Sequence, residues 1–202
     1  MARRSDHSRE EIHEMALSAA EKIVREQGYG GLSARKVAGA IGYTVGTLYL
    51  VFDNLDDLIL QVNSRTLDRL HAQMLQEQSA HAPARERLLQ LGHSYIRFAN
   101  EDPHRWGMIF EHRFPPEQET PAWFRVKVER MFALVEARLE PLAGEHSANE
   151  IAQAARALWS GVHGICILAI TDRLDIAGVS SVQQLTQFLM DNFLDGFISG
   201  CN

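Results

Sequence analysis

Apolar residues recur at intervals of three and four positions along almost the whole of this 202-residue chain. In the first such segment the apolar side chains are Ile12, Met15, Ala16, Ala19, Ala20, Ile23 and Val24. This spacing is that of one face of an amphipathic helix. No stretch shows the alternation typical of paired strands, so the pattern predicts an all-α fold.

Capping residues and glycines divide this pattern into about nine helices. Ser8 and Glu11 form a capping-box pattern that predicts the start of the first helix, and Gly28 predicts its end. The same signals predict further helices over residues 33–41, 44–51, 54–79, 83–102, 103–112, 121–142, 147–174 and 181–198. The hydrophobic content of 46% is sufficient for these helices to bury a core.

Two short helices, 33–41 and 44–51, are joined by a turn centred on Gly42, which is the spacing of a helix-turn-helix. We expect a three-helix DNA-binding domain over residues 1–53 and a larger helical bundle over residues 54–202. The alternative is a small helical subdomain whose polar face is only solvated. The expected DNA contacts come from the N-terminal arm and the two short helices: Arg3, Arg4, Ser33, Ala34, Arg35, Lys36, Thr44, Val45, Gly46, Thr47 and Tyr49.

The charge of the chain bears on how it would bind DNA. The net charge is −6, and seven Lys and Arg against nine Asp and Glu in residues 1–60 leave −2 there. We therefore expect non-specific DNA binding to be weak and strongly dependent on salt. Because Val45, Leu50 and Val51 stand where base-reading polar side chains would be expected, our hypothesis is that specificity comes from thymine methyl contacts, DNA shape and the Arg3/Arg4 arm.

Residues 10–59 resemble the N-terminal domain of TetR-family transcriptional regulators. The matching features are "AA" in the first helix, "GY" at its end, "S-x-R-K-V-A" in the second helix and "G-T-L-Y-x-x-F" in the third. Two later stretches, "ANEDPHRWGMIF" and "LWSGVHGICIL", resemble the C-terminal domain of one subgroup that carries W-x-x-x-H-G.

The resemblance implies a homodimer in which each recognition helix reads one half-site of a near-palindromic operator on double-stranded DNA. It also implies a repressor that is released when a small molecule enters the C-terminal domain. The sequence departs from the family at Leu55, where a phosphate-binding lysine is common. A phosphate at this place would instead meet Asp53, Asp56 and Asp57.

Aromatic and methionine residues cluster between Tyr95 and Met131, and most of them are expected to be core. A subset is expected to line a ligand cavity between helices. His163 lies one turn after Trp159, and this pair would suit a mostly apolar ligand with one hydrogen-bonding group; the alternative is a core or interface histidine. The expected ligand-binding residues are Tyr95, Phe98, Trp106, Ile109, Phe110, Trp123, Phe124, Met131, Trp159 and His163.

The last two helices are apolar on more than one face, so each needs a second partner. Small residues on the penultimate helix would allow another helix to approach closely. We expect a four-helix interface between two copies of the chain. The expected interface residues are Ala154, Ala157, Gly161, Gly164, Leu168, Leu185, Leu189 and Phe193.

Two cysteines, Cys166 and Cys201, fit neither a disulfide framework nor a zinc site, which indicates a reducing compartment. The N-terminal residues lack the apolar stretch of a signal peptide, and "GICILAI" is too short to span a bilayer. We therefore expect a cytoplasmic protein with no membrane partner, associated with the nucleoid when it is bound to DNA.

The sequence contains no phosphate-binding glycine loop, zinc-protease motif or nucleophile elbow. We therefore expect neither an enzyme nor a cofactor. A metal site would require the scattered His93, His104, His112 and His163 to meet, and we expect none. The remaining alternative is a helical module that binds a small molecule or a protein and has weak or lost operator binding. Leu55 and the acidic charge favour that alternative.

Overall fold

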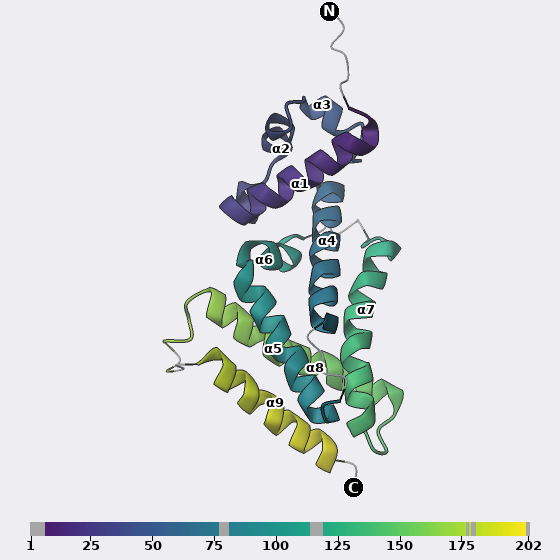
Figure 1. Cartoon of the computed structure of the whole chain (residues 1–202), viewed down its shortest axis with the longest axis vertical. Coiled ribbons are helices and arrows are strands. Elements are labelled where there is room, and N and C mark those ends of the chain that lie inside the picture. The colour runs from purple at the N-terminus through teal and green to yellow at the C-terminus, as the bar shows by residue number, and fades with distance from the viewer. Residues whose placement is uncertain (1–6, 77–80, 114–118, 177, 179–180, 201–202) are drawn as a thin grey trace, which may run out of the picture. The chain divides into compact units, whose positions relative to one another are not determined.

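The computed structural model describes residues 7–76, 81–113, 119–176, 178 and 181–200, and all regular elements within them are helical (Figure 1). This confirms the predicted all-α fold with about nine helices. The elements are α1 (Arg9–Gln27), η1 (Tyr29–Gly31), α2 (Ala34–Ala40), α3 (Val45–Leu48), α4 (Leu55–Gln76), α5 (Ala84–Glu101), α6 (Pro103–Glu111), α7 (Ala122–Leu139), η2 (Glu140–Leu142), α8 (Ala148–Ile170) and α9 (Val182–Ser199).

The helices begin where the sequence places capping residues. Ser8 and Glu11 form the predicted capping box at the start of α1, and Ser147 forms another at the start of α8. The side chain of Asn54 accepts a hydrogen bond from the Asp57 N–H at 2.9 Å, which caps α4. These bonds satisfy backbone N–H groups that have no partner inside a helix.

Two predicted helices are shorter in the structure. The helix expected over residues 44–51 is α3, Val45–Leu48, because the following N–H groups of Leu50 and Val51 bond three residues back and tighten the chain. The helix expected to reach residue 174 ends at Ile170. Two residues later the backbone of Asp172 has a φ of 52°, which no α-helix accommodates.

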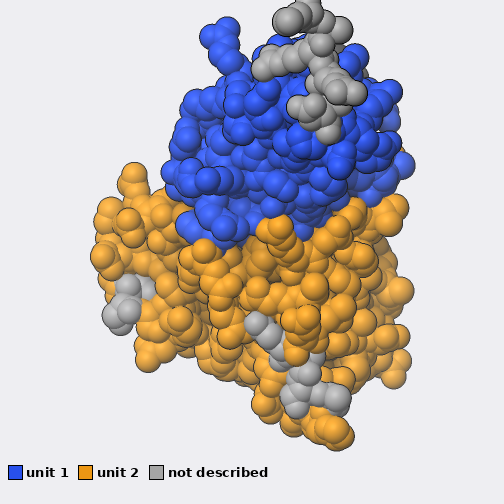
Figure 2. Space-filling view, turned by 45° about the horizontal axis from the view of Figure 1, so that its top comes forward, with its two compact units in different colours: residues 1–66, 102–124 blue, residues 67–101, 125–202 orange. Residues whose placement is uncertain are grey.

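The chain forms two compact units, coloured separately in Figure 2. Unit 1 contains Met1–Thr66 and Asp102–Phe124, and unit 2 contains Leu67–Glu101 and Arg125–Asn202. Helix α6 therefore belongs to the same unit as α1, α2 and α3. The functional boundary expected after residue 53 stays a prediction.

Unit 1 is held together by an apolar core to which five helices contribute. The side chains of Val24 from α1, Val37 from α2, Leu48 from α3, Val62 from α4 and Met108 from α6 are all fully buried in it. Burying such side chains stabilises a fold by about 1.5–3 kcal/mol each. The two short helices are thus fixed to longer ones, which explains how elements of seven and four residues keep their place.

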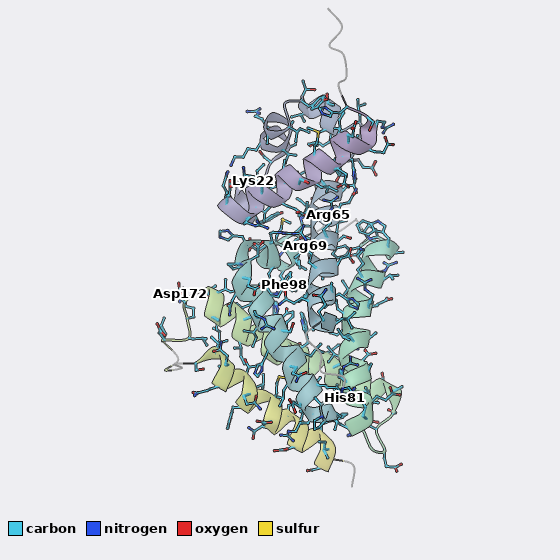
Figure 3. The ribbon with its side chains drawn as sticks, in the orientation of Figure 1. Lys22, Arg65, Arg69, His81, Phe98 and Asp172 are labelled. Carbon is cyan, nitrogen blue, oxygen red and sulfur yellow. The ribbon has the colours of Figure 1, made fainter. Side chains whose placement is uncertain are left out.

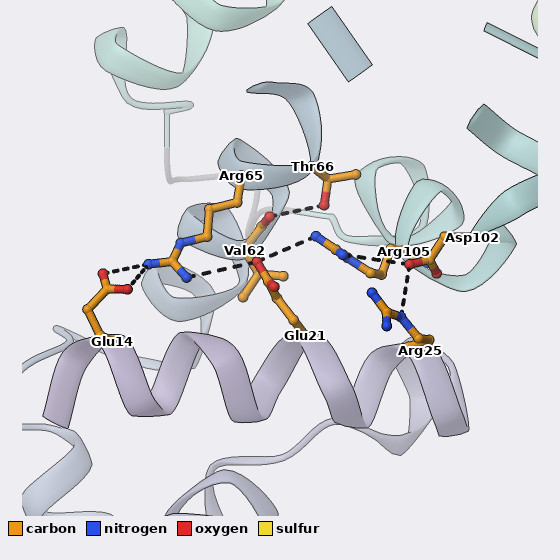
Figure 4. Close-up of polar contacts among 8 residues, drawn as sticks. All are labelled: Glu14, Glu21, Arg25, Val62, Arg65, Thr66, Asp102 and Arg105. Carbon is orange, nitrogen blue, oxygen red and sulfur yellow. Dashed lines mark hydrogen bonds and ion pairs between the residues drawn. The ribbon is translucent and has the colours of Figure 1, made fainter. Parts of the chain in front are cut away.

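A network of ion pairs joins α1 to the start of α6 in the same unit (Figure 4). The guanidinium of Arg105 lies 3.4 Å from the carboxylate of Glu21 and 3.6 Å from that of Asp102. Arg25 reaches the same Asp102 carboxylate at 3.3 Å. Both Glu21 and Arg105 are buried residues, so these charges are largely removed from water.

The network extends from α1 to α4 through Arg65 (Figure 4). Its guanidinium donates to both carboxylate oxygens of Glu14, at 2.5 and 2.6 Å, and lies 4.0 Å from Glu21. Both bonds come from one guanidinium nitrogen, and charge-assisted hydrogen bonds of this kind are stronger than bonds between neutral groups. Helices α1, α4 and α6 are therefore joined within unit 1 by charge as well as by apolar packing.

In unit 2, close approach between helices depends on two glycines. A Cβ atom at Gly161 of α8 would lie 2.8 Å from Leu189 of α9, and one at Gly92 of α5 would lie 2.5 Å from Met190 Sδ. Both distances are shorter than van der Waals contact, so a larger residue at either place would displace its neighbour. Helices α5, α8 and α9 pack against one another in this unit.

Candidate DNA-binding surface and ligand cavity

The predicted helix-turn-helix is formed by α2, a short turn and α3. Ser33 caps α2 by accepting a hydrogen bond from the Lys36 N–H at 3.3 Å. Gly42 has a φ of 77°, a conformation that favours glycine, and the following Tyr43 N–H bonds to the Ala38 carbonyl at 2.9 Å. The turn therefore has the glycine that its geometry requires.

The N-terminal end of α3 presents hydroxyl groups. Thr44 caps the helix, accepting from the Thr47 N–H at 3.2 Å, and the two threonine hydroxyls lie 3.0 Å apart. Tyr49, directly after the helix, is 44% exposed. These hydroxyls suit contacts to phosphate oxygens.

The two basic residues of α2 differ in their surroundings. The Lys36 ammonium donates to the side-chain oxygen of Gln27 at 2.7 Å, so it ties α2 to the end of α1. Arg35 is exposed and carries its charge on the surface. The predicted contacts Arg3 and Arg4 lie outside the described residues, whereas Ala34 is half-buried beside Ser33.

Sequence reasoning missed two contacts that fix this surface. The guanidinium of Arg9 in α1 donates to the backbone carbonyl of Leu50, directly after α3. His7 is hydrogen-bonded to the hydroxyl of Tyr43 at 2.8 Å. Both residues precede or begin α1 and are far in sequence from their partners, so no local motif links them.

The acidic residues after α3 are partly engaged within unit 1. The Asp57 carboxylate accepts from the Asp53 N–H at 3.1 Å and from the Gln61 side chain at 3.0 Å. The Asp56 carboxylate lies 3.6 Å from the buried imidazole of His112. Of the three, Asp53 is exposed, whereas Asp56 and Asp57 are half-buried.

Unit 2 contains a small apolar cavity of about 40 Å³. Its lining comes from α4, α5, α7, α8 and α9, and consists of Met74, Leu88, Leu91, Gly92, Tyr95, Val135, Leu158, Trp159, Val162 and Met190. A cavity of this volume holds only about three water molecules. Drug-sized ligands occupy pockets of roughly 300–1,000 Å³, so any such ligand must displace side chains here.

One polar pair adjoins the cavity. The hydroxyl of Tyr95 is hydrogen-bonded to Nδ1 of His163 at 3.0 Å, and the Trp159 indole stacks on the same imidazole with ring centroids 5.0 Å apart. Burial lowers the pKa of His163 below its ordinary value of 6.5. The imidazole is therefore neutral at pH 7.

The predicted ligand-binding residues divide between the two units. Tyr95 and Trp159 line the cavity, and His163 adjoins it, whereas Phe98 (Figure 3) and Met131 are half-buried elsewhere in unit 2. The other five lie in unit 1: Trp106, Ile109, Phe110, Trp123 and Phe124. Sequence reasoning missed eight lining residues, because aliphatic residues on five helices carry no signal that distinguishes cavity from core.

The residues expected at a dimer interface lie on α8 and α9. Gly161 and Leu189 contact each other within one chain, whereas Ala157 is exposed and Leu168 is 41% exposed. Ala154, Gly164, Leu185 and Phe193 are half-buried. Phe188 of α9 was not predicted, although it is 69% exposed.

Among the residues that the structure describes, no three His, Cys, Asp or Glu side chains lie close enough together to hold a metal ion. Within the same residues no helix has the length and apolarity needed to cross a membrane.

Comparison with known families identifies the chain. The geometry of α2, the turn and α3 defines a helix-turn-helix DNA-binding protein. The family described as bacterial regulatory proteins of the tetR family matches residues 16–62, and the tetracyclin repressor-like C-terminal domain matches residues 88–193. The second match alone covers more than half of the chain. The protein belongs to the TetR family of DNA-binding transcription regulators.

Solved structures share its fold along nearly their whole length. A protein of unknown function from Rhodococcus sp. RHA1 is 20% identical over 97% of this chain and 98% of its own, with a TM-score of 0.75. A tetR-family transcriptional regulator from Streptomyces coelicolor is 17% identical over 96% and 84%, with a TM-score of 0.68. The fatty acid degradation regulator FadR from Bacillus halodurans is 16% identical over 90% and 94%, with a TM-score of 0.63. At these identities the likeness concerns the fold alone.

Proposed function

We propose that this protein is a transcriptional repressor that binds a near-palindromic operator as a homodimer. The observation that carries the proposal is the helix-turn-helix of unit 1, whose exposed side chains include Arg35, Thr44 and Tyr49. A guanidinium and two hydroxyls on one motif suit phosphate contacts that set its register on DNA. Two copies would then read two half-sites about 34–36 Å apart.

We propose that α8 and α9 of two copies form the dimer interface. The exposed apolar side chains of Leu168 and Phe188 support this, since burying them between copies removes apolar surface from water. The remaining predicted interface residues lie on the same two helices.

We propose that the cavity of unit 2 is the effector site and that the effector releases the repressor from DNA. The lining suits a mostly apolar molecule, and the neutral Tyr95–His163 pair suits one uncharged hydrogen-bonding group on it. Met74 and Met190 line the cavity, and unbranched methionine side chains move at low cost. The cavity would enlarge by their displacement.

In this proposal the protein acts only by binding DNA, its effector and a second copy of itself, without catalysis or a cofactor. We place it in the cytoplasm, associated with the nucleoid when an operator is bound.

The test is fluorescence anisotropy with the intergenic DNA beside the protein's own gene and with a scrambled duplex, at two salt concentrations. We expect tight binding to the intergenic duplex alone, lost in Tyr49→Ala and in Arg35→Ala. Arg125→Ala is the matched control, because Arg125 is an exposed arginine of unit 2. Equal, salt-sensitive binding to both duplexes would overturn operator recognition.

That second outcome would favour a helical small-molecule or protein-binding module with weak or lost operator binding. The net charge of −2 in residues 1–60 and the apolar Leu55 are the observations that favour this alternative. A module of this kind would still bind its ligand in unit 2, but it would bind no DNA duplex specifically.

A further inference from the structure

The exposed side of the recognition segment carries an unexplained glycine. Gly46 lies in the second position of α3, where glycine is about 1 kcal/mol less favourable than alanine. A Cβ atom added there would meet only the Thr44 hydroxyl, at an ordinary 3.7 Å, and the backbone does not have a positive φ. Neither packing nor conformation within the protein therefore requires glycine at this position.

Leu50 lies on the same side of the segment as Gly46. The two residues are four positions apart, and the helical bonding of Tyr49 to Val45 and of Leu50 to Thr47 continues the helical path between them. The Leu50 side chain is 64% exposed. Val51, by contrast, packs against the core. Val45, Leu50 and Val51 therefore differ in how far their side chains are available for contact with thymine methyl groups.

The position of Leu50 is fixed by another helix. Arg9 of α1 donates to the Leu50 carbonyl, although Leu50 follows the last residue of α3. The next residues are also held: Phe52 is buried and stacks on His13, with ring centroids 4.7 Å apart. These contacts fix the backbone on both sides of the exposed Leu50 side chain.

The chemistry of the segment limits what it can read. The sequence of residues 45–50, VGTLYL, contains no lysine, arginine, asparagine or glutamine, which are the side chains that pair with guanine or adenine edges in the major groove. The Thr44 oxygen accepts the capping bond from the Thr47 N–H, and the Thr44 and Thr47 hydroxyls lie 3.0 Å apart, so each hydroxyl has a partner within the segment. The apolar feature of the major groove is the 5-methyl group of thymine.

We propose that Gly46 and Leu50 form a thymine-reading surface. The bare backbone at Gly46 allows a base edge to approach closely, and the Leu50 side chain packs on the thymine methyl. Arg9 acts as a positioning residue. The proposal rests on operator binding by the helix-turn-helix and names what that site recognises.

The experiment starts from an operator defined by in vitro selection with the full-length protein. Each conserved thymine in one half-site is then replaced by deoxyuridine, which removes only the methyl group. At the thymine that contacts Leu50, we expect the affinity of the wild-type protein to fall about fourfold. This fold-change corresponds to the free energy of burying one methyl group. Leu50→Ala should bind the thymine operator more weakly and lose this sensitivity, so both duplexes bind it equally.

Two further variants test the other parts of the surface. Gly46→Ala should weaken operator binding, whereas Gly39→Ala, at an equally open and exposed helical position of α2, should not. Arg9→Gln should reduce the deoxyuridine effect without abolishing operator binding.

The outcomes separate this inference from the proposed function. Specific binding with no deoxyuridine effect, or with an effect that Leu50→Ala retains, overturns thymine reading and leaves the regulator in place. Selection of G-rich sites without thymine has the same meaning. A selection that returns no preferred sequence overturns both, because the surface then has nothing to read.

Discussion

The buried ion pair between Arg105 and Glu21 gives the sharpest prediction about stability. The Arg105 side chain is 4% exposed and that of Glu21 is 11% exposed. Replacing Arg105 by methionine keeps the apolar stem but removes the guanidinium that lies 3.4 Å from the buried Glu21 carboxylate, while the Arg65 guanidinium remains 4.0 Å from it. Removing one partner of a buried ion pair lowers the free energy of unfolding by about 3–5 kcal/mol. Because whole domains are stable by about 5–15 kcal/mol, the loss would be a large fraction of the total.

The assay is urea denaturation followed by circular dichroism, on Arg105→Met, Glu21→Met and the double variant. If the loss of stability comes from leaving one charge of the pair without the other, the two single effects should not add. The double variant should then be at least about 1 kcal/mol more stable than the sum of the two single effects predicts. Arg65→Met is the matched control. Its main partner Glu14 is 62% exposed, so its loss should cost less than about 1 kcal/mol.

Two results would refute this reasoning. A loss below about 1 kcal/mol in Arg105→Met would mean that the Glu21 carboxylate regains contact with water at little cost. Additive single effects would mean that the two side chains contribute by apolar packing alone.

Three further predictions concern the cavity, the DNA surface and pH. Gly92→Ala should cost about 1 kcal/mol or less in urea denaturation, because its methyl group would meet only the flexible end of Met190, with Sδ at 2.5 Å and Cε at 3.0 Å; a larger loss would contradict this. Arg35→Gln should weaken binding to all duplexes alike and lower the salt slope by about one per half-site in anisotropy titrations; an unchanged slope would exclude a phosphate contact. Burial lowers the pKa of His112 below 6.5, so the unfolded chain binds the proton more tightly. The free energy of unfolding should therefore be highest above about pH 6.5 and should decrease as the pH falls below that value. In urea denaturation at several pH values, His112→Gln should make this decrease smaller.

The local signals of the sequence predicted the helices well. Ser8, Asn54 and Ser147 each form the cap that the sequence indicates, since a cap involves residues only three positions apart. The end of the recognition helix was predicted less well. Its last turn is set by Arg9 and by the burial of Phe52, and neither follows from the residues of the helix itself.

The cavity and the division into units were beyond sequence reasoning for a different reason. Residues 95–131 form one aromatic cluster in the sequence, yet Asp102–Phe124 folds with unit 1 while Tyr95 belongs to unit 2. A cavity is the space left between helices, so it depends on small mismatches such as Gly92 against Met190. No periodic pattern within one helix encodes that space.

The return of the chain to unit 1 has a consequence for engineering. The fully buried Met108 of α6 completes the core under the DNA-binding helices, although 45 residues separate it from Val62 in the chain. A chimaera that joins residues 1–66 of this protein to the remainder of a relative would bring in a foreign α6. Its side chains would meet Glu21 and Val24 without matching their charge or shape. Specificity swaps within the family should therefore transplant two segments of chain, the second of them residues 102–124.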